Sequence, residues 1–170
     1  VPRVFGYPRL VELLRRLLEE RIPIGDLKAI LEAVAGLQPG EGLPVLVESV
    51  RTAMRLHICA TARCGRPALP VLLVDRSIER AITDSVAEAG GHQCLAIHPD
   101  TARAIIGQGR DGVARMRDAD GPPALVTEQA CRRFLRKIIE SELPEVHVIA
   151  YHELAPEVRV EAVGKVSLAA

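Results

Sequence analysis

The sequence predicts a chain of the α + α/β class, with a small three-helix unit at residues 1–66 and an open α/β sheet domain at residues 67–170. Three observations carry this prediction. Leucines recur at helical spacing near the start, residues 69–74 form one continuous apolar run, and strand-like and helix-like patterns alternate after that run. Such alternation is typical of a sheet of about four to five strands with helices on its faces. The stretch 62–67 has the composition of a linker between the two parts.

The first part contains three expected helices, at residues 8–21, 24–35 and 44–59. Pro8 suits the first turn of the first helix. Asp26 lies near the start of the second, where the helix dipole favours a negative charge, and Gly36 is a natural stop. Apolar residues at i, i+3, i+4 and i+7 spacing predict the buried faces. In the first helix they are Leu10, Leu13, Leu14, Leu17 and Leu18, and in the third Leu46, Val47, Val50, Met54 and Ile58.

The second part has expected strands at residues 69–74, 94–97, 125–126 and 146–151, with a final alternating segment over 158–166 that is expected to be an edge strand. The apolar run 69–74 marks a strand buried on both faces. Helices are expected over 78–86, after Pro99 and over 128–142. Gly90-Gly91 and Gly121-Pro122-Pro123 are expected breaks between elements.

Composition excludes several classes of protein. Lys+Arg and Asp+Glu both number 22, so the basic excess of a nucleic-acid binder is missing. No apolar run approaches the roughly 20 residues that a membrane-spanning helix needs. A hydrophobic fraction of 48% provides a real core, so the four cysteines are expected to be reduced thiols in a reducing compartment. The chain opens at Val1, without Met, and we expect it to be a soluble part of a longer protein.

The segment 107–112 matches the pattern G-x-G-x-x-G, which binds a dinucleotide when it follows a strand and opens a helix. Here the segment follows an expected helix, and no suitable acidic residue sits on a second strand about 20 residues later. We therefore interpret it as a flexible break between a helix and a turn, with nucleotide binding as the alternative.

A zinc site is the second chemical possibility, because Cys59 and Cys64 have nearly the spacing of a ligand pair. His57, His92 or His98 would have to complete it, and no matching second pair follows. Ordinary thiols are the preferred interpretation, and we expect no metal and no cofactor. Cys94 and Cys131 fall on apolar, core-facing positions, where a thiolate is disfavoured. Because no nucleophile, base and carboxylate converge, we expect that the chain is not an enzyme.

A run of basic residues on the expected helix 128–142 has two interpretations. It is either a solvated helix face, as charge runs usually are, or a docking patch for an acidic protein partner. Its members are Arg132, Arg133, Arg136 and Lys137.

Several collinear segments resemble the type III secretion and flagellar export-gate family (FHIPEP), which comprises the injectisome SctV and flagellar FlhA proteins. The segment 22–33 is similar to the family's "PIRDL…ILEAL" stretch and 69–75 to its "LPVLVLD" strand. The sequence departs from the usual pattern at Gly25, Arg76, Ala150 and His152. The other matching segments are 48–51, 95–100, 132–140, 148–154 and 163–166.

The resemblance implies that the chain is the C-terminal part of the family's cytoplasmic region, with residues 1–66 as its third subdomain and 67–170 as its fourth. It also implies a nonameric ring beneath the export channel, on the cytoplasmic face of the bacterial inner membrane. An absent N-terminal domain would provide the membrane attachment. The implied partners are other copies of the chain, secretion chaperones with their export substrates, and components of the export ATPase complex.

Ring contacts between identical subunits need complementary charges to set their register. We therefore predict that exposed charges of the helical unit form the ring interface. These are Arg16, Glu20, Arg21, Asp26, Glu48, Arg51 and Arg55. The leading hypothesis is an injectisome export gate, the flagellar counterpart is second, and a stand-alone nucleotide-binding α/β enzyme or a zinc-stapled module is the alternative from another class.

Overall fold

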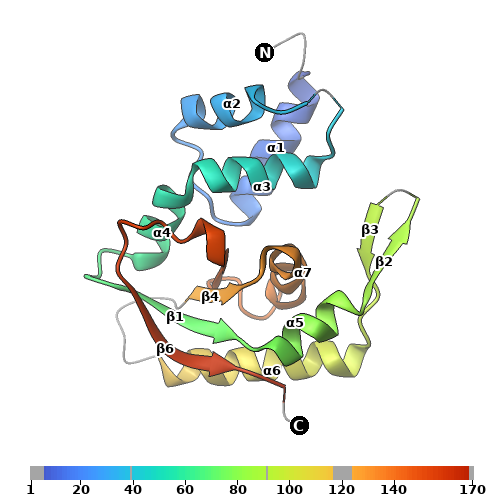
Figure 1. The fold of residues 1–170 in the computed structure, drawn as a ribbon, viewed down its shortest axis with the longest axis vertical. Coiled ribbons are helices and arrows are strands. Elements are labelled where there is room, and N and C mark those ends of the chain that lie inside the picture. The colour runs from blue at the N-terminus through green and yellow to red at the C-terminus, as the bar shows by residue number, and fades with distance from the viewer. Residues whose placement is uncertain (1–5, 39, 91, 117–123, 169–170) are drawn as a thin grey trace.

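The computed structural model describes residues 6–38, 40–90, 92–116 and 124–168. The predicted turn at 121–123 and Gly91 lie outside the described residues. Within them the chain forms a helical unit, at the top of Figure 1, and an α/β unit below it. The predicted fold class is confirmed, with the differences described below.

The helical unit contains four helices where three were expected. The elements are α1 (Tyr7–Glu19), α2 (Leu27–Ala35), α3 (Leu43–Ala53) and α4 (Arg55–Arg63). The expected helix 44–59 is broken at Met54, whose φ of −95° and ψ of 14° lie outside the helical region. This break turns α4 towards the sheet. Met54, Ile58 and Cys59 are therefore buried in one apolar cluster that also contains residues of the sheet.

Local chemistry explains where two of these helices begin and end. The side chain of Asp26 accepts a hydrogen bond from the backbone N–H of Ala29 at 3.0 Å and so caps α2. Helix α4 ends where Cys64 adopts a left-handed conformation, with φ of 51°, and Gly65 follows with φ of 80°. Two successive residues with positive φ reverse the chain and start it towards the sheet.

The α/β unit is built on a four-stranded parallel sheet in the order β5-β4-β1-β6. The strands are β1 (Leu69–Val74), β4 (Ala124–Thr127), β5 (His147–Ala150) and β6 (Val160–Val166). The short 3-10 helix η1 (Tyr151–Glu153) directly follows β5. Strand β6 is an edge strand, as predicted, and the apolar run 69–74 forms a central strand.

The expected strand 94–97 does not belong to this sheet. Its residues contribute to β3 (His92–Leu95), which pairs antiparallel with β2 (Val86–Ala89) in a separate hairpin. The expected helix 78–86 ends early for the same reason: α5 spans Arg76–Thr83, and Val86 already lies in β2. A parallel strand needs a crossover of a dozen or more residues, whereas Gly90, with φ of 59°, closes a tight hairpin here.

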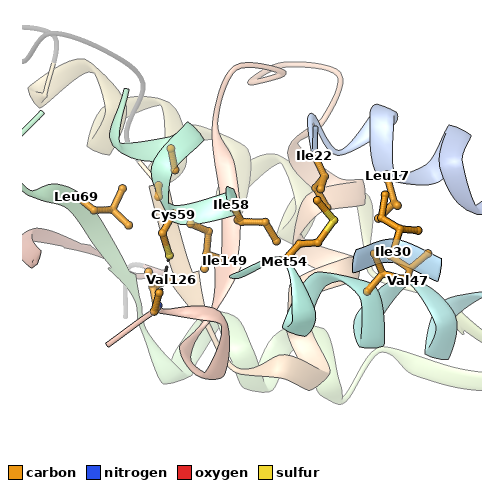
Figure 2. Close-up of a cluster of buried hydrophobic side chains, with 14 of the residues drawn as sticks. Leu17, Ile22, Ile30, Val47, Met54, Ile58, Cys59, Leu69, Val126 and Ile149 are labelled. Atoms are coloured by element: carbon orange, nitrogen blue, oxygen red, sulfur yellow. Dashed lines mark hydrogen bonds between the residues drawn. The ribbon is translucent and has the colours of Figure 1, made fainter. Parts of the chain in front are cut away.

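Two apolar clusters cover the two faces of the sheet. Leu72, Val74, Leu125 and Val148 pack with α5, α6 (Pro99–Arg115) and α7 (Gln129–Ile139). Leu69, Val71, Val126 and Ile149 belong instead to the cluster that contains the core of the helical unit. Figure 2 shows this cluster running from Leu17 through Met54 to Leu69. The helical unit is therefore a second layer on the sheet, and the boundary at residue 66/67 remains a prediction.

The glycine motif 107–112 lies inside α6, so the predicted flexible break is wrong. A Cβ added at Gly112 would lie 3.0 Å from Leu72 Cδ1, and one at Gly109 would lie 3.3 Å from Leu143 Cδ1. Gly112 lets α6 approach the sheet closely, and Gly109 lets it approach the segment that follows α7. Nothing lies within 4 Å of the corresponding position at Gly107.

Two substitutions in α6 are expected to change stability in opposite directions. Gly107→Ala should raise the free energy of unfolding by about 0.5–1 kcal/mol, because it removes backbone freedom from the unfolded chain and finds open space. Gly112→Ala should lower it by about 1–3 kcal/mol, because its Cβ overpacks the buried Leu72. Urea unfolding measures both. Equal effects of the two variants would contradict the packing role of Gly112.

Candidate functional site

A buried cluster of five charged residues joins the helical unit to the α/β unit. We call it the seam cluster, and its members are Glu20, Glu48, Arg51, Arg132 and Glu153. They come from the residue after α1, from α3, from α7 and from η1, so four distant segments of the chain converge on one point.

Arg51 is the centre of the cluster and only 2% exposed. Its Nε donates to Glu153 Oε1 at 2.5 Å and its Nη2 to Glu153 Oε2 at 2.8 Å, which makes a bidentate pair. Its Nη1 donates to Glu20 Oε2 at 2.6 Å, and its Nη2 also donates to the backbone carbonyl of Val148 at 3.1 Å. One guanidinium thus holds α1, η1 and β5 together.

Arg132, on α7, is 1% exposed and shares one acidic partner, Glu20, with Arg51. Its Nη1 donates to Glu20 Oε2 at 2.6 Å, and its Nη2 donates to Glu48 Oε1. Glu20 therefore bridges two arginines, one from each unit. Such charges are tolerable in the interior only because they are paired and hydrogen-bonded.

The electrostatics of the cluster favour its charged form. Burial alone raises the pKa of Glu153, but the hydrogen bond and charge of Arg51 outweigh burial, and the pKa lies below its usual value. Burial likewise tends to lower the pKa of Arg132, but the charges of Glu20 and Glu48 raise it above its usual value. Three carboxylates against two guanidiniums leave the cluster with one excess negative charge.

The prediction that all seven charged residues of the helical unit are exposed is wrong. Arg51 is buried, Glu20 and Glu48 are largely buried, and all three belong to the seam cluster. The remaining four are available at the surface. Arg16, Arg21 and Asp26 are exposed and Arg55 is half-buried; Arg16 pairs with Glu19 at 3.1 Å, and Asp26 caps α2.

The predicted docking patch on α7 is also divided by the fold. Arg132 is in the seam cluster, and Arg136 is buried, with its Nη1 donating to the carbonyl of Val146 at 2.9 Å. Arg133 is half-buried, donates to Gln93 and lies 4.4 Å above the Phe134 ring. Lys137 alone of the four is fully on the surface. Arg132 and Arg136, at positions i and i+4, both point inward, and a run of charges in the sequence does not predict which of its members are buried.

The proposed zinc ligands do not gather in the part of the chain that the structure describes. Cys59 is buried and donates to the carbonyl of Glu153 at 3.4 Å, whereas Cys64 and His57 are exposed. The side chain of His92 lies outside the described part. The group that does gather is Glu48, His152 and Glu153, whose ligand atoms lie within 4.8 Å of one another. Both Glu153 oxygens already accept from Arg51, and Oε2 also accepts from the N–H of Ala150, so this carboxylate is a poor metal ligand.

Sequence reasoning missed Glu153, in the seam cluster, and His147, which lines a cavity beside it. Glu153 was considered only as part of a matching segment, and His147, at the start of β5, was not considered at all. No local pattern marks either of them, because their partners lie about 100 residues away, as in the Arg51–Glu153 pair with a separation of 102.

Among the described residues, none forms a helix long and apolar enough to cross a membrane.

The fold is that of known secretion proteins. The structure matches a chain of the Chlamydia pneumoniae CdsV and CdsO protein complex with a TM-score of 0.84 and 32% identity, over 98% of this chain and 49% of that one. It also matches the nonameric EPEC SctV-C with a TM-score of 0.77 and 28% identity, over 96% of this chain and 49% of that one. The fold is thus that of the C-terminal, cytosolic domains of type III secretion system proteins.

Sequence comparison identifies the family. Residues 1–159 match the FHIPEP family, and the chain belongs to it. It is 34% identical to Protein hrpC2 of Xanthomonas euvesicatoria over 159 residues, covering 93% of this chain. It is 32% identical to the flagellar biosynthesis protein FlhA of Caulobacter vibrioides over 167 residues, covering 98% of this chain. The chain spans 24% of the length of each of these relatives.

The seam cluster predicts a large cost for removing one carboxylate. Glu153→Gln should lower the free energy of unfolding by about 3–5 kcal/mol, because it leaves the buried Arg51 without its bidentate partner. Chemical denaturation measures the loss. Arg110→Ala is the matched control, since it removes an exposed pair with Glu142 and should cost less than about 1 kcal/mol. Comparable losses in the two variants would refute the central role of Glu153.

Proposed function

We propose that the chain is part of the cytoplasmic ring of a type III secretion export gate, where it docks chaperone–substrate complexes and helps to order protein export. The single observation that supports this most is the fold shared with a nonameric relative over 96% of this chain. We place the chain at the cytoplasmic face of the bacterial inner membrane, attached through a part of the protein outside these residues. In this role the chain binds proteins and performs no catalysis.

The outer face of α1 is our candidate for the contact between neighbouring subunits. Its inner stripe, Leu13 and Leu17, is fully buried. A second apolar stripe faces outward, with Tyr7 78%, Val11 45% and Leu18 52% exposed. Exposed apolar residues in a row on one helix are typical of a protein contact.

Charges of the helical unit would set the register of the contact. Arg16, Arg21 and Asp26 are exposed, and Arg55 is half-buried on α4. A ring of identical subunits needs two different complementary patches on each copy, because the contact is heterologous. The mixed signs of these charges suit such a contact. The seam residues Glu20, Glu48 and Arg51 would act indirectly, by holding α1 and α3 in place.

The surface between α3, α7 and the β2–β3 hairpin is our candidate for partner docking. It forms an open groove of about 530 Å³. Val45 and Phe134 provide its apolar lining, and Glu88, Gln93 and Arg133 its polar lining. Lys137 is the exposed cation further along α7. We propose chaperone–substrate complexes and export ATPase components as the partners. A relative, CdsV, forms a complex with another protein, CdsO, which supports a role in binding proteins.

The flagellar export gate is the second candidate function, because the identity to FlhA is close to that of the secretion relatives. The glycine motif gives little support to a nucleotide-binding enzyme, since Gly109 and Gly112 are buried inside α6 against Leu143 and Leu72.

A chimera tests the ring proposal. Residues 1–170 would replace the matched part of the nonameric SctV-C chain, and mass photometry should still detect nonamers. Leu18→Glu in this chimera should abolish them, because it puts a charge into the apolar contact, while leaving the melting temperature within about 2 °C. Val163→Glu is the matched control: Val163 is 45% exposed, on β6 of the other unit.

Two results would count against the proposal. A chimera that stays monomeric where SctV-C assembles would contradict ring formation by this chain. Nonamers that persist in the Leu18→Glu variant would contradict the contact assigned to α1. A second chimera would carry residues 1–170 in place of the matched part of FlhA. If it restores swimming to a strain that lacks its flagellar export gate, that result would favour the second candidate.

A further inference from the structure

His147 lies at the first position of β5, at the contact between the helical unit and the α/β unit, which we call the seam. It lines a small cavity with residues from three other elements: Arg21 follows α1, Arg51 is on α3 and Arg136 is on α7. The one carboxylate in this lining is Glu20, which already accepts from Arg51 and Arg132. The charged residues around the ring of His147 are therefore mainly cations.

Two of the guanidiniums around His147 are held by partners. Arg51 is bound to Glu153 and Glu20, and Arg136 donates to the carbonyl of Val146. Arg21 is exposed and lies in a turn with φ of 58°. A proton on His147 would thus add a positive charge among three guanidiniums, and the carboxylate in the same lining, Glu20, already accepts from Arg51 and Arg132.

This environment keeps the imidazole neutral. Burial, together with the charges of Arg21, Arg136 and Arg51, lowers the pKa of His147 to about 4. If the seam opens, the ring meets water and its pKa returns to about 6.5. The open state then binds the proton more tightly, so acidification between pH 6.5 and pH 4 must shift the equilibrium towards opening.

Other titratable groups in the seam face different neighbours. A ring nitrogen of His152 lies within 4.8 Å of carboxylate oxygens of Glu48 and Glu153. His57 is exposed on α4. Among the described histidines of the seam, His147 is the one whose charged neighbours are mostly cations.

We propose that His147 is a proton-sensitive latch, whose protonation opens the seam between the helical unit and β5 while each unit stays folded. This latch is independent of the proposed ring assembly and chaperone docking. Because linkage favours the state with the higher affinity for the proton, the opening equilibrium constant should rise on the order of 30-fold from pH 8 to pH 5.

Two buried cysteines report on the two units separately. Cys59, on α4, lies against the seam, where its Sγ contacts the carbonyl of Glu153 and the N–H of Ala155. Cys131, on α7, is buried inside the α/β unit against Glu79 and Thr83. Cys64 and Cys94 are exposed and supply the reference labelling rate. Opening of the seam should therefore expose Cys59 and leave Cys131 protected.

The experiment is pulsed labelling of the chain with dithiodipyridine from pH 8 to pH 5, resolved by peptide mass spectrometry. The expected result is a rise in the Cys59 rate relative to Cys64, on the order of 30-fold, with Cys131 unchanged. His147→Gln should abolish most of this rise, whereas the control His57→Gln should retain it. The titration of His147 in the unaltered chain, followed by NMR, provides a measurement that needs no variant.

Each of the other outcomes overturns the latch. Cys59 that stays protected at pH 5 shows that the seam does not open. Cys131 that labels in parallel with Cys59 shows global unfolding. A rise that persists in His147→Gln assigns the effect to another group, and an ordinary midpoint for His147, near pH 6.5, removes its physical basis.

Discussion

The bidentate pair between Arg51 and Glu153 is the interaction on which the arrangement of the whole chain depends. It lies where α3, η1 and β5 meet, and the same guanidinium also reaches Glu20 at the end of α1. Arg132 closes the cluster from α7 through Glu20 and Glu48. Buried ion pairs of this kind add little net stability but impose strict geometry, because any shift leaves a charge unpaired. The apolar core supplies the free energy, and the seam cluster sets the orientation of one unit on the other.

A core that supplies the stability and a charged cluster that sets the orientation of the two units together suit a subunit of a ring. The apolar contact between the helical unit and the sheet, from Met54 and Ile58 to Val71 and Ile149, is non-directional and would tolerate small rotations. A ring tolerates such rotations poorly, because an error at each subunit accumulates around the circle. Charges in the seam remove that freedom, while the outer stripe of α1 and the groove beside the hairpin remain open to other chains. His147 lies beside this cluster, among Arg21, Arg51 and Arg136, so the seam contains both the main restraint on the two units and the proposed site of proton sensitivity.

Much of the fold was predictable because its signals are local. The apolar run 69–74, the stripe of α1 and the strand–helix alternation depend on the period of side chains in one element, which a single segment displays. Leu18 is the exception: it was predicted on the buried face of α1 and is 52% exposed. The two errors in elements also have local causes that compete with periodicity. Met54 breaks a helix whose apolar pattern continues through the break, and Gly90 folds the segment after α5 into a hairpin before it can cross to the sheet. Gly109 and Gly112 match the pattern of a phosphate-binding loop, but here they allow α6 to pack closely. Glycine allows a close approach of the backbone in both a phosphate-binding loop and a packed helix, so the pattern alone does not distinguish them.

The sequence by itself determined the class of fold, most of the elements and, through collinear motifs, membership of the export-gate family. The tertiary structure decided which charges face solvent. Arg51, Arg132 and Arg136 look the same in a sequence as Arg16 and Lys137, because burial of a charge depends on a partner from a remote segment. Glu153 lies 102 residues from Arg51, and Glu20 lies 112 residues from Arg132. No local period carries that information, so the seam cluster and the position of His147 became visible only when the chain was folded.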